Sequence, residues 1–243
     1  MQKQYRLAQH LAAAAMALCV LPFASAQDAG AYKAVIEHKA RDADRKDDAK
    51  RKPAEFLRFA EVRPGMQVLD VAAGGGATSE LVALAVGDKG TVYAQTAKES
   101  DKLKQRLAAN PQPNLKPVVA PYDNPVPAGT PPLDLVIINM SYHDIANTPT
   151  DRAAMNKALF AALKPGGKLV IIDNAAKAGA GTSATKTLHR IEEATVIEEA
   201  TKAGFSVDAR SDYLRAPNDP REQPFFEMKG TPDDKFAIRF IKK

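Results

Sequence analysis

The sequence predicts an α/β fold built on a mainly parallel β-sheet, and three observations indicate it. An apolar run of strand length is followed by a glycine-rich turn, a helix and a second strand (68–71, 72–76, 78–86 and 91–94). Residues 133–139, LDLVIIN, are continuously apolar, as expected of a parallel strand buried on both faces. Helical segments alternate with the predicted strands, which is typical of α/β proteins.

The first 26 residues are typical of a secretory signal peptide rather than of the fold. A positively charged start precedes an apolar run, 11–23, which is short for a membrane span, and Ala24-Ser25-Ala26 matches an A-x-A cleavage site. We therefore expect a periplasmic mature chain that begins at Gln27 and has no membrane span; an uncleaved anchor is the alternative. Cleavage also removes Cys19, the only cysteine, so no disulfide is expected.

Residues 27–52 form a helical, charged segment, in which 41–52 carries many charges of both signs. The favoured interpretation is a solvated linker or exposed helix. The alternative is a lid over a ligand crevice. The main domain is predicted to span 53–243, with Pro53 at the first position of a helix.

The rest of the domain continues the alternation of helices and strands. Helices are predicted at 98–109, 151–163 and 187–203, and strands at 117–119, 168–173, 205–214 and 235–241. Residues 174–185 are small and flexible, and 215–234 form a long polar excursion between the last two strands.

Composition narrows the class of protein. A length of 243 residues suits one domain, and 45% hydrophobic residues allow a sizeable core. The net charge is +5, but no basic block is interleaved with aromatic residues, so nucleic acid binding is not indicated. The four histidines are scattered along the sequence, so no metal site is expected. The oligomeric state is not predicted.

Two interpretations of the glycine turn compete. A dinucleotide fingerprint, G-x-G-x-x-G, fits Gly74 and Gly76 but meets Ser79 at its third glycine. The turn also resembles the first motif of class I S-adenosylmethionine (SAM)-dependent methyltransferases, D-x-G-x-G-x-G, with Asp70, Ala72, Gly74 and Gly76. The segments Arg63-Pro64-Gly65-Met66-Gln67-Val68 and Leu163-Lys164-Pro165-Gly166-Gly167-Lys168-Leu169 resemble that family in the same order.

The resemblance implies a Rossmann-like three-layer sandwich with a seven-stranded, mostly parallel sheet and an antiparallel last strand. It also implies SAM as the cofactor. Asp70 would order the glycine turn, and main-chain groups from Ala72 to Gly76 would approach the adenosyl group. Asn139, at the end of the fourth strand, would also contact the cofactor.

Two further cofactor positions are implied less directly. The family places an acidic residue at the end of the second strand for the ribose hydroxyls; here that position is assigned to Gln95, and Glu99 is a possible substitute. With Ala72 in place of a glycine, Gln95 is a second departure from the pattern. Asp123 would meet the adenine amino group, although an Asx-turn in a proline-rich loop explains it equally well.

The catalytic candidates follow the fourth strand, where the family's loop faces the transferred methyl group. His143 is the candidate general base, because its ordinary pKa lies near neutrality, and Asp144 would orient it. Tyr142 would close over the sulfonium by a cation–π contact. His189 and Arg190 would bind an acidic acceptor. For His143 the alternative is a histidine that caps the loop by hydrogen bonding. For His189 and Arg190 the alternative is the exposed start of a helix.

The whole pattern resembles a subgroup of exported bacterial predicted methyltransferases. The segments that carry this resemblance are Arg51-Lys52-Pro53-Ala54-Glu55, Tyr142-His143-Asp144, His189-Arg190-Ile191, Leu214-Arg215, Asp219-Pro220-Arg221 and Asp234-Lys235-Phe236. We therefore expect a SAM-dependent methyltransferase acting on a small-molecule acceptor. Because SAM is made in the cytoplasm, the alternative is a degenerate methyltransferase fold that binds a nucleoside-like or other small ligand without turnover.

Overall fold

Seven strands form one sheet in the order β3-β2-β1-β4-β5-β7-β6. The computed structural model describes residues 32–229 and 231–243, so the predicted signal peptide, 1–26, lies outside the described residues. β7 is antiparallel to both of its neighbours and the other strand pairs are parallel, which confirms the predicted fold class. The strands are β1 Gln67–Val71, β2 Thr91–Thr96, β3 Leu115–Val119, β4 Leu133–Asn139, β5 Leu163–Asn174, β6 Ser206–Ser211 and β7 Lys235–Ile241.

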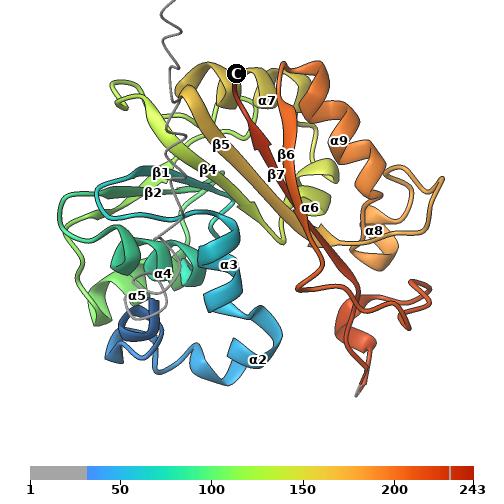
Figure 1. The fold of residues 1–243 in the computed structure, drawn as a ribbon, viewed down its shortest axis with the longest axis horizontal. Coiled ribbons are helices and arrows are strands. Elements are labelled where there is room, and N and C mark those ends of the chain that lie inside the picture. The colour runs from blue at the N-terminus through green and yellow to red at the C-terminus, as the bar shows by residue number, and fades with distance from the viewer. Residues whose placement is uncertain (1–31, 230) are drawn as a thin grey trace, which may run out of the picture.

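Helices cover both faces of the sheet and complete the three layers (Figure 1). One core includes side chains of α3 (Pro53–Phe59), α4 (Ala77–Val86) and α5 (Asp101–Ala109). The other includes α6 (Tyr142–Ala146), α7 (Arg152–Ala162) and α9 (Glu193–Lys202). Short helices of the described residues include η1 Lys39–Arg41, η2 Arg45–Asp47, α2 Asp48–Arg51, α8 Thr185–Leu188 and η3 Phe225–Glu227. Of the helices in the described part of the chain, none has the length and apolarity needed to cross a membrane.

Strand β4 is covered by helices on both faces of the sheet, and this position explains its apolar sequence. Leu133, Val136 and Ile138 pack into the core under α6, α7 and α9. Leu135 and Ile137 pack into the core under α3, α4 and α5. Because successive side chains of a strand point to opposite faces, a strand covered on both faces needs apolar residues at nearly every position.

The predicted helix 187–203 is wrong as one continuous element. α8 ends at Leu188, His189 takes a left-handed conformation with φ 51°, and Ile191 forms a bridge with Ala175 before α9 begins. The helical periodicity did not reveal this break, because its cause is tertiary: the backbone pairs with the segment after β5, and the Arg190 side chain is buried.

Two local predictions also differ from the structure. The predicted loop after β4 becomes the short helix α6 from Tyr142 onward. The strand predicted at 168–173 begins earlier, at Leu163, because Leu163 pairs with Leu133, and residues 164–167 form an irregularity between this pair and the pair of Lys168 with Leu135.

The charged segment before α3 contacts the domain through a few buried residues, whereas residues 42, 43, 45, 46 and 49–52 are exposed, as the favoured interpretation of a solvated linker or exposed helix predicts. Ala40, Arg41 and Asp44 are buried. Asp44 accepts a hydrogen bond from Arg106 of α5 at 2.7 Å, and Arg106 also pairs with Glu80 of α4. Burial of charged groups is tolerated where they are paired, as they are here. The segment therefore covers the first turn of α4, beside the expected ligand crevice.

Candidate functional site

The glycine turn after β1 holds three residues in the left-handed conformation: Ala72 (φ 56°), Gly74 (φ 57°) and Gly76 (φ 78°). Ala72 thus adopts the backbone conformation that a glycine would take at this position, although this strains an alanine. A Cβ atom added to Gly76 would lie 2.6 Å from Leu103, so this glycine is needed for packing against α5. A Cβ atom on Gly74 would meet, among the described residues, only the Ala72 carbonyl at 4.0 Å. Main chain at Gly74 is therefore open to a ligand.

Asp70 connects β1 to the start of α4. Its carboxylate is buried and accepts a hydrogen bond from Ser79 Oγ at 2.5 Å. Burial raises the pKa of the Asp70 carboxyl to about 7, and the Ser79 hydrogen bond only partly opposes that shift. This contact fits the turn-ordering role predicted for Asp70. Ser79, which breaks the dinucleotide fingerprint, is the partner that role requires.

Gln95 does not fit the ribose-binding role predicted for it. Its side chain is buried, its Oε1 accepts from the Ala72 backbone N–H at 2.9 Å, and its Nε2 donates to the Ala120 carbonyl at 2.6 Å. Through its oxygen and its nitrogen, the carboxamide of Gln95 therefore links the carboxyl ends of β1, β2 and β3. Thr96, the next residue, ends β2. The substitute Glu99 is exposed and pairs with Lys104 at 2.5 Å.

Asp123 and Asn139 lie at different depths of the same sheet edge. Asp123 is exposed in the turn after β3. Asn139 ends β4 and donates a hydrogen bond to Thr78 Oγ1 at 3.0 Å. The hollow beside Asn139, bordered by Arg41 of the N-terminal segment, has a volume of ≈ 30 Å³, which suits water rather than a nucleoside. A nucleoside would instead lie on the open side of the turn at Gly74.

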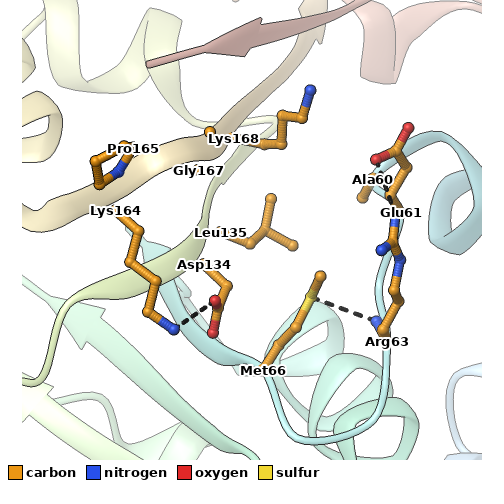
Figure 2. Close-up of a pocket in the computed structure, with 11 residues that line it drawn as sticks. Ala60, Glu61, Arg63, Met66, Asp134, Leu135, Lys164, Pro165, Gly167 and Lys168 are labelled. Carbon is orange, nitrogen blue, oxygen red and sulfur yellow. Dashed lines mark hydrogen bonds and ion pairs between the residues drawn. The ribbon is translucent and has the colours of Figure 1, made fainter. Parts of the chain in front are cut away.

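A larger hollow, of ≈ 220 Å³, lies at the opposite end of the sheet (Figure 2). It is lined by residues at the amino ends of the strands, including Met66 before β1, Asp134 of β4 and Lys164 of β5. Figure 2 shows Asp134 and Lys164 facing each other, with Lys164 Nζ 2.6 Å from Asp134 Oδ1. Open α/β sheets bind ligands at the carboxyl ends of their strands, so we place the candidate site at that edge instead.

His143, in the first turn of α6, is held by Asp173 at the carboxyl end of β5. His143 Nδ1 lies 2.6 Å from Asp173 Oδ1, and the His143 backbone N–H donates to Asp173 Oδ2 at 2.8 Å. Burial alone would lower the pKa of His143, but its contacts with Asp144 and Asp173 outweigh burial and raise the pKa to about 9. Because Nδ1 faces Asp173, only Nε2, which lies 3.3 Å from Asp144 Oδ1, is left to meet a ligand.

Asp144 and His189 complete a cluster with His143. His143 Nε2 lies 3.3 Å and His189 Nδ1 lies 3.6 Å from Asp144 Oδ1. The two imidazole rings meet edge to face at 5.5 Å between centroids. Two of the histidines that are scattered along the sequence are therefore brought together by the fold. Burial, and to a lesser degree the charge of Asp144, raises the pKa of the Tyr122 hydroxyl in the turn after β3.

Tyr142 and Arg190 are buried and bind other side chains of the fold. Tyr142 is buried, donates to Glu199 Oε2 at 2.7 Å and accepts from Asn156 Nδ2 at 2.8 Å. Its ring is thus part of the core, which does not fit a cation–π contact with a sulfonium. Arg190 is also buried, with Nη1 2.8 Å from Asp219 Oδ2, so it does not fit the acceptor-binding role predicted for it.

The sequence reading missed Asp173 and the aromatic pair Phe225 and Phe226. The signal for Asp173 was its place as an acidic residue at the end of a predicted strand, the position where α/β sheets gather ligand-binding groups. Phe225 and Phe226 lie in the long excursion before β7, and their ring centroids are 6.5 Å and 5.3 Å from that of His189. Sequence separation hides that contact, because only the fold brings the excursion to the cluster.

Comparisons with known proteins address the fold. The chain matches no protein-family model and no curated protein. Among solved structures it is similar to a SAM-dependent methyltransferase from Aquifex aeolicus, at 18% identity over 84% of this chain and 98% of that one, with TM-score 0.61. It is also similar to a SAM-dependent methyltransferase from Mesorhizobium loti, at 17% identity over 80% and 99%, with TM-score 0.58.

A TehB-like SAM-dependent methyltransferase from Corynebacterium glutamicum is similar too, at 18% identity over 77% of this chain and 86% of that chain, with TM-score 0.52. At such low identities the shared property is the fold, since one fold serves many functions. The chain therefore has the fold of SAM-dependent methyltransferases.

Proposed function

We propose that this chain is a SAM-dependent methyltransferase that acts on a small-molecule acceptor. The observation that carries the proposal is the shared edge of the sheet. The open glycine turn at Gly74 follows β1, and the cluster of His143 and Asp144 follows the adjacent strand β4. A donor at the turn would therefore lie next to an acceptor at the cluster.

The donor half of the site rests on main chain and small side chains. The adenosyl group would lie across Gly74, with Asp123 near the adenine and Asn139 near the methionine part. Methyl transfer from a sulfonium is an in-line displacement with a good leaving group, so alignment of donor and acceptor is the main contribution required of the protein. Asp70 supports this alignment indirectly, because its contact with Ser79 fixes the turn.

The acceptor half is built from His143, Asp144 and His189, with Phe225 and Phe226 beside His189. Asp144 is 60% exposed at its side chain and His189 35%, so both are accessible to a small molecule. His143 Nε2 and the Asp144 carboxylate would face a polar group of the acceptor.

The proposal includes export to the periplasm, on the strength of the N-terminal sequence. N-terminal sequencing of protein from fractionated cells tests it. A periplasmic chain beginning at Gln27 would support export, and an unprocessed cytoplasmic chain would contradict it.

A second candidate is a methyltransferase fold that binds a small ligand without turnover. The observation that favours it is Gln95, whose carboxamide is engaged by backbone groups and carries no charge for the ribose hydroxyls.

Calorimetric titration of the purified protein with SAM and with S-adenosylhomocysteine separates the two candidates. Micromolar binding of either ligand supports the methyltransferase, and no heat with both at millimolar concentration supports the second candidate. Gly74→Ala should weaken SAM binding, because its methyl group would occupy the open face. Gly129→Ala is the matched control, because Gly129 also has a positive φ (77°) and open surroundings but lies in the loop before β4.

A further inference from the structure

Three ligand atoms for a metal ion converge at the carboxyl edge of the sheet. They are one nitrogen each of His143 and His189 and a carboxylate oxygen of Asp144, and all lie within 4.8 Å of one another. His143 and Asp144 come from α6, and His189 follows α8. Helix α7 and strand β5 separate His189 from His143 and Asp144 in the sequence, so the fold creates the cluster.

The spacing matches a coordination sphere. Two ligand atoms bound at about 2.1 Å to one tetrahedral zinc ion lie about 3.4 Å apart. The two distances from Asp144 Oδ1 are 3.3 Å to His143 Nε2 and 3.6 Å to His189 Nδ1. These two edges of the cluster are close to the length that a bound ion requires, and the third edge, between the two imidazole nitrogens, is within 4.8 Å.

Asp173 orients His143 for such a role. It is fully buried, lies 2.6 Å from His143 Nδ1, and accepts backbone hydrogen bonds from His143 and Asn174, each at 2.8 Å. With the Nδ1 proton directed at Asp173, Nε2 faces Asp144 and His189. Metal-binding histidines commonly donate their other ring N–H to a carboxylate in this way.

The backbone holds His189 in place. Its φ of 51° is left-handed, which is uncommon for a residue other than glycine. The strain is maintained on both sides: Asn174 Nδ2 donates to the His189 carbonyl at 3.1 Å, and the neighbouring Arg190 is fixed by Asp219. Strained residues cluster at functional sites, where surrounding structure over-determines them.

We propose that His143, Asp144 and His189 bind a divalent first-row transition metal ion, for which Zn²⁺ is the probe. Two imidazoles and one carboxylate suit zinc or iron better than magnesium or calcium, which prefer oxygen ligands. Three protein ligands leave coordination positions for water or for an oxygen or sulfur atom of an acceptor. That last assignment rests on the proposed function, whereas metal binding itself does not.

The test is calorimetric titration of the purified, EDTA-treated protein, made without a histidine tag, with ZnCl₂ at neutral pH. We expect one Zn²⁺ ion per chain with micromolar or tighter affinity, and no heat with millimolar MgCl₂. Asp144→Asn and His189→Asn should each weaken zinc binding by more than roughly 10-fold, as should Asp173→Asn by roughly 10- to 100-fold. Asn is chosen at position 189 because it tolerates the left-handed backbone.

The matched control is His38→Gln, because His38 is an exposed histidine outside the cluster and should leave zinc affinity unchanged. Circular dichroism checks that each variant is folded. If the Asp173 variant unfolds, the variants at Asp144 and His189, whose side chains are accessible to solvent, keep the test valid. Absence of zinc binding, or binding that these two variants leave unaltered, overturns the proposal. Because SAM takes no part in this titration, its failure is distinct from failure of the proposed function.

Discussion

Arg190 Nη1 lies 2.8 Å from Asp219 Oδ2, and neither side chain is exposed to solvent. Arg190 also donates to the carbonyls of Ala175 and Gln223, at 3.1 Å and 3.0 Å. This arginine joins the segment after β5 to the long excursion before β7. Residues 219–226 of the excursion are therefore held against the domain, with Phe225 and Phe226 beside His189, although the sequence of the excursion is polar and rich in proline.

Arg190→Leu should lower the free energy of unfolding by about 3–5 kcal/mol, because it leaves the buried Asp219 carboxylate without its cation. Urea unfolding followed by circular dichroism measures the change. Arg210→Leu is the control: Arg210 is 58% exposed and 3.8 Å from Glu193, and a surface pair contributes about 0–1 kcal/mol. Equal losses for the two variants would show that the buried pair has no special role.

Ala72→Gly should stabilise the protein by up to about 1 kcal/mol, because it removes the strain of an alanine at φ 56°. The same substitution at Ala73, which is not among the left-handed residues, should destabilise by about 0.5–1 kcal/mol through added chain entropy. Thermal and urea unfolding of the two variants provide the comparison. The prediction fails if Ala72→Gly is the more destabilising of the two.

Asp70 should make stability fall as the pH rises. Its pKa is raised by burial from 3.8 to about 7, so the folded state favours the protonated carboxyl. The resulting stabilisation is complete below about pH 4 and is lost as the pH rises through about 7, with a total of at most about 4 kcal/mol. Asp70→Asn keeps an acceptor for Ser79 and should flatten this dependence.

Urea unfolding of both proteins between about pH 5 and about pH 8 measures the difference, in which the contributions of all other groups cancel. The variant should gain on the original protein up to about pH 7, and the difference should level off above that pH. A constant difference between the two would mean that Asp70 is ionised in the folded protein throughout.

Tyr142→Phe should reduce stability by about 1–3 kcal/mol and leave SAM affinity unchanged, because the hydroxyl bonds Glu199 and Asn156 inside the core. Urea unfolding measures the change in stability, and the SAM titration measures the affinity for SAM. Tyr142→Leu removes the aromatic ring as well and is the sharper test of its place. A selective loss of SAM affinity in that variant, with the fold intact, would restore the predicted contact with the sulfonium.

The sequence by itself determined the sheet and its layers. The run at 133–139 coincides with β4, and the glycine turn lies between β1 and α4 as predicted. These features are local: period and continuity of apolar residues decide which faces are buried, and glycine takes the left-handed backbone at little cost. The resemblance of the same turn to a family motif identified Asp70, whose partner Ser79 lies only nine residues along the chain.

Only the tertiary structure decided which side chains meet at the site. His143 lies in α6, Asp173 lies in β5 and His189 follows α8, so their contacts depend on where these elements lie in space. The burial of Tyr142, Gln95 and Arg190 was equally invisible, because a polar residue near a strand end has the same local pattern whether it faces solvent or a partner. Spacing along a chain specifies secondary structure, whereas the partner of a polar group is set by packing between distant segments.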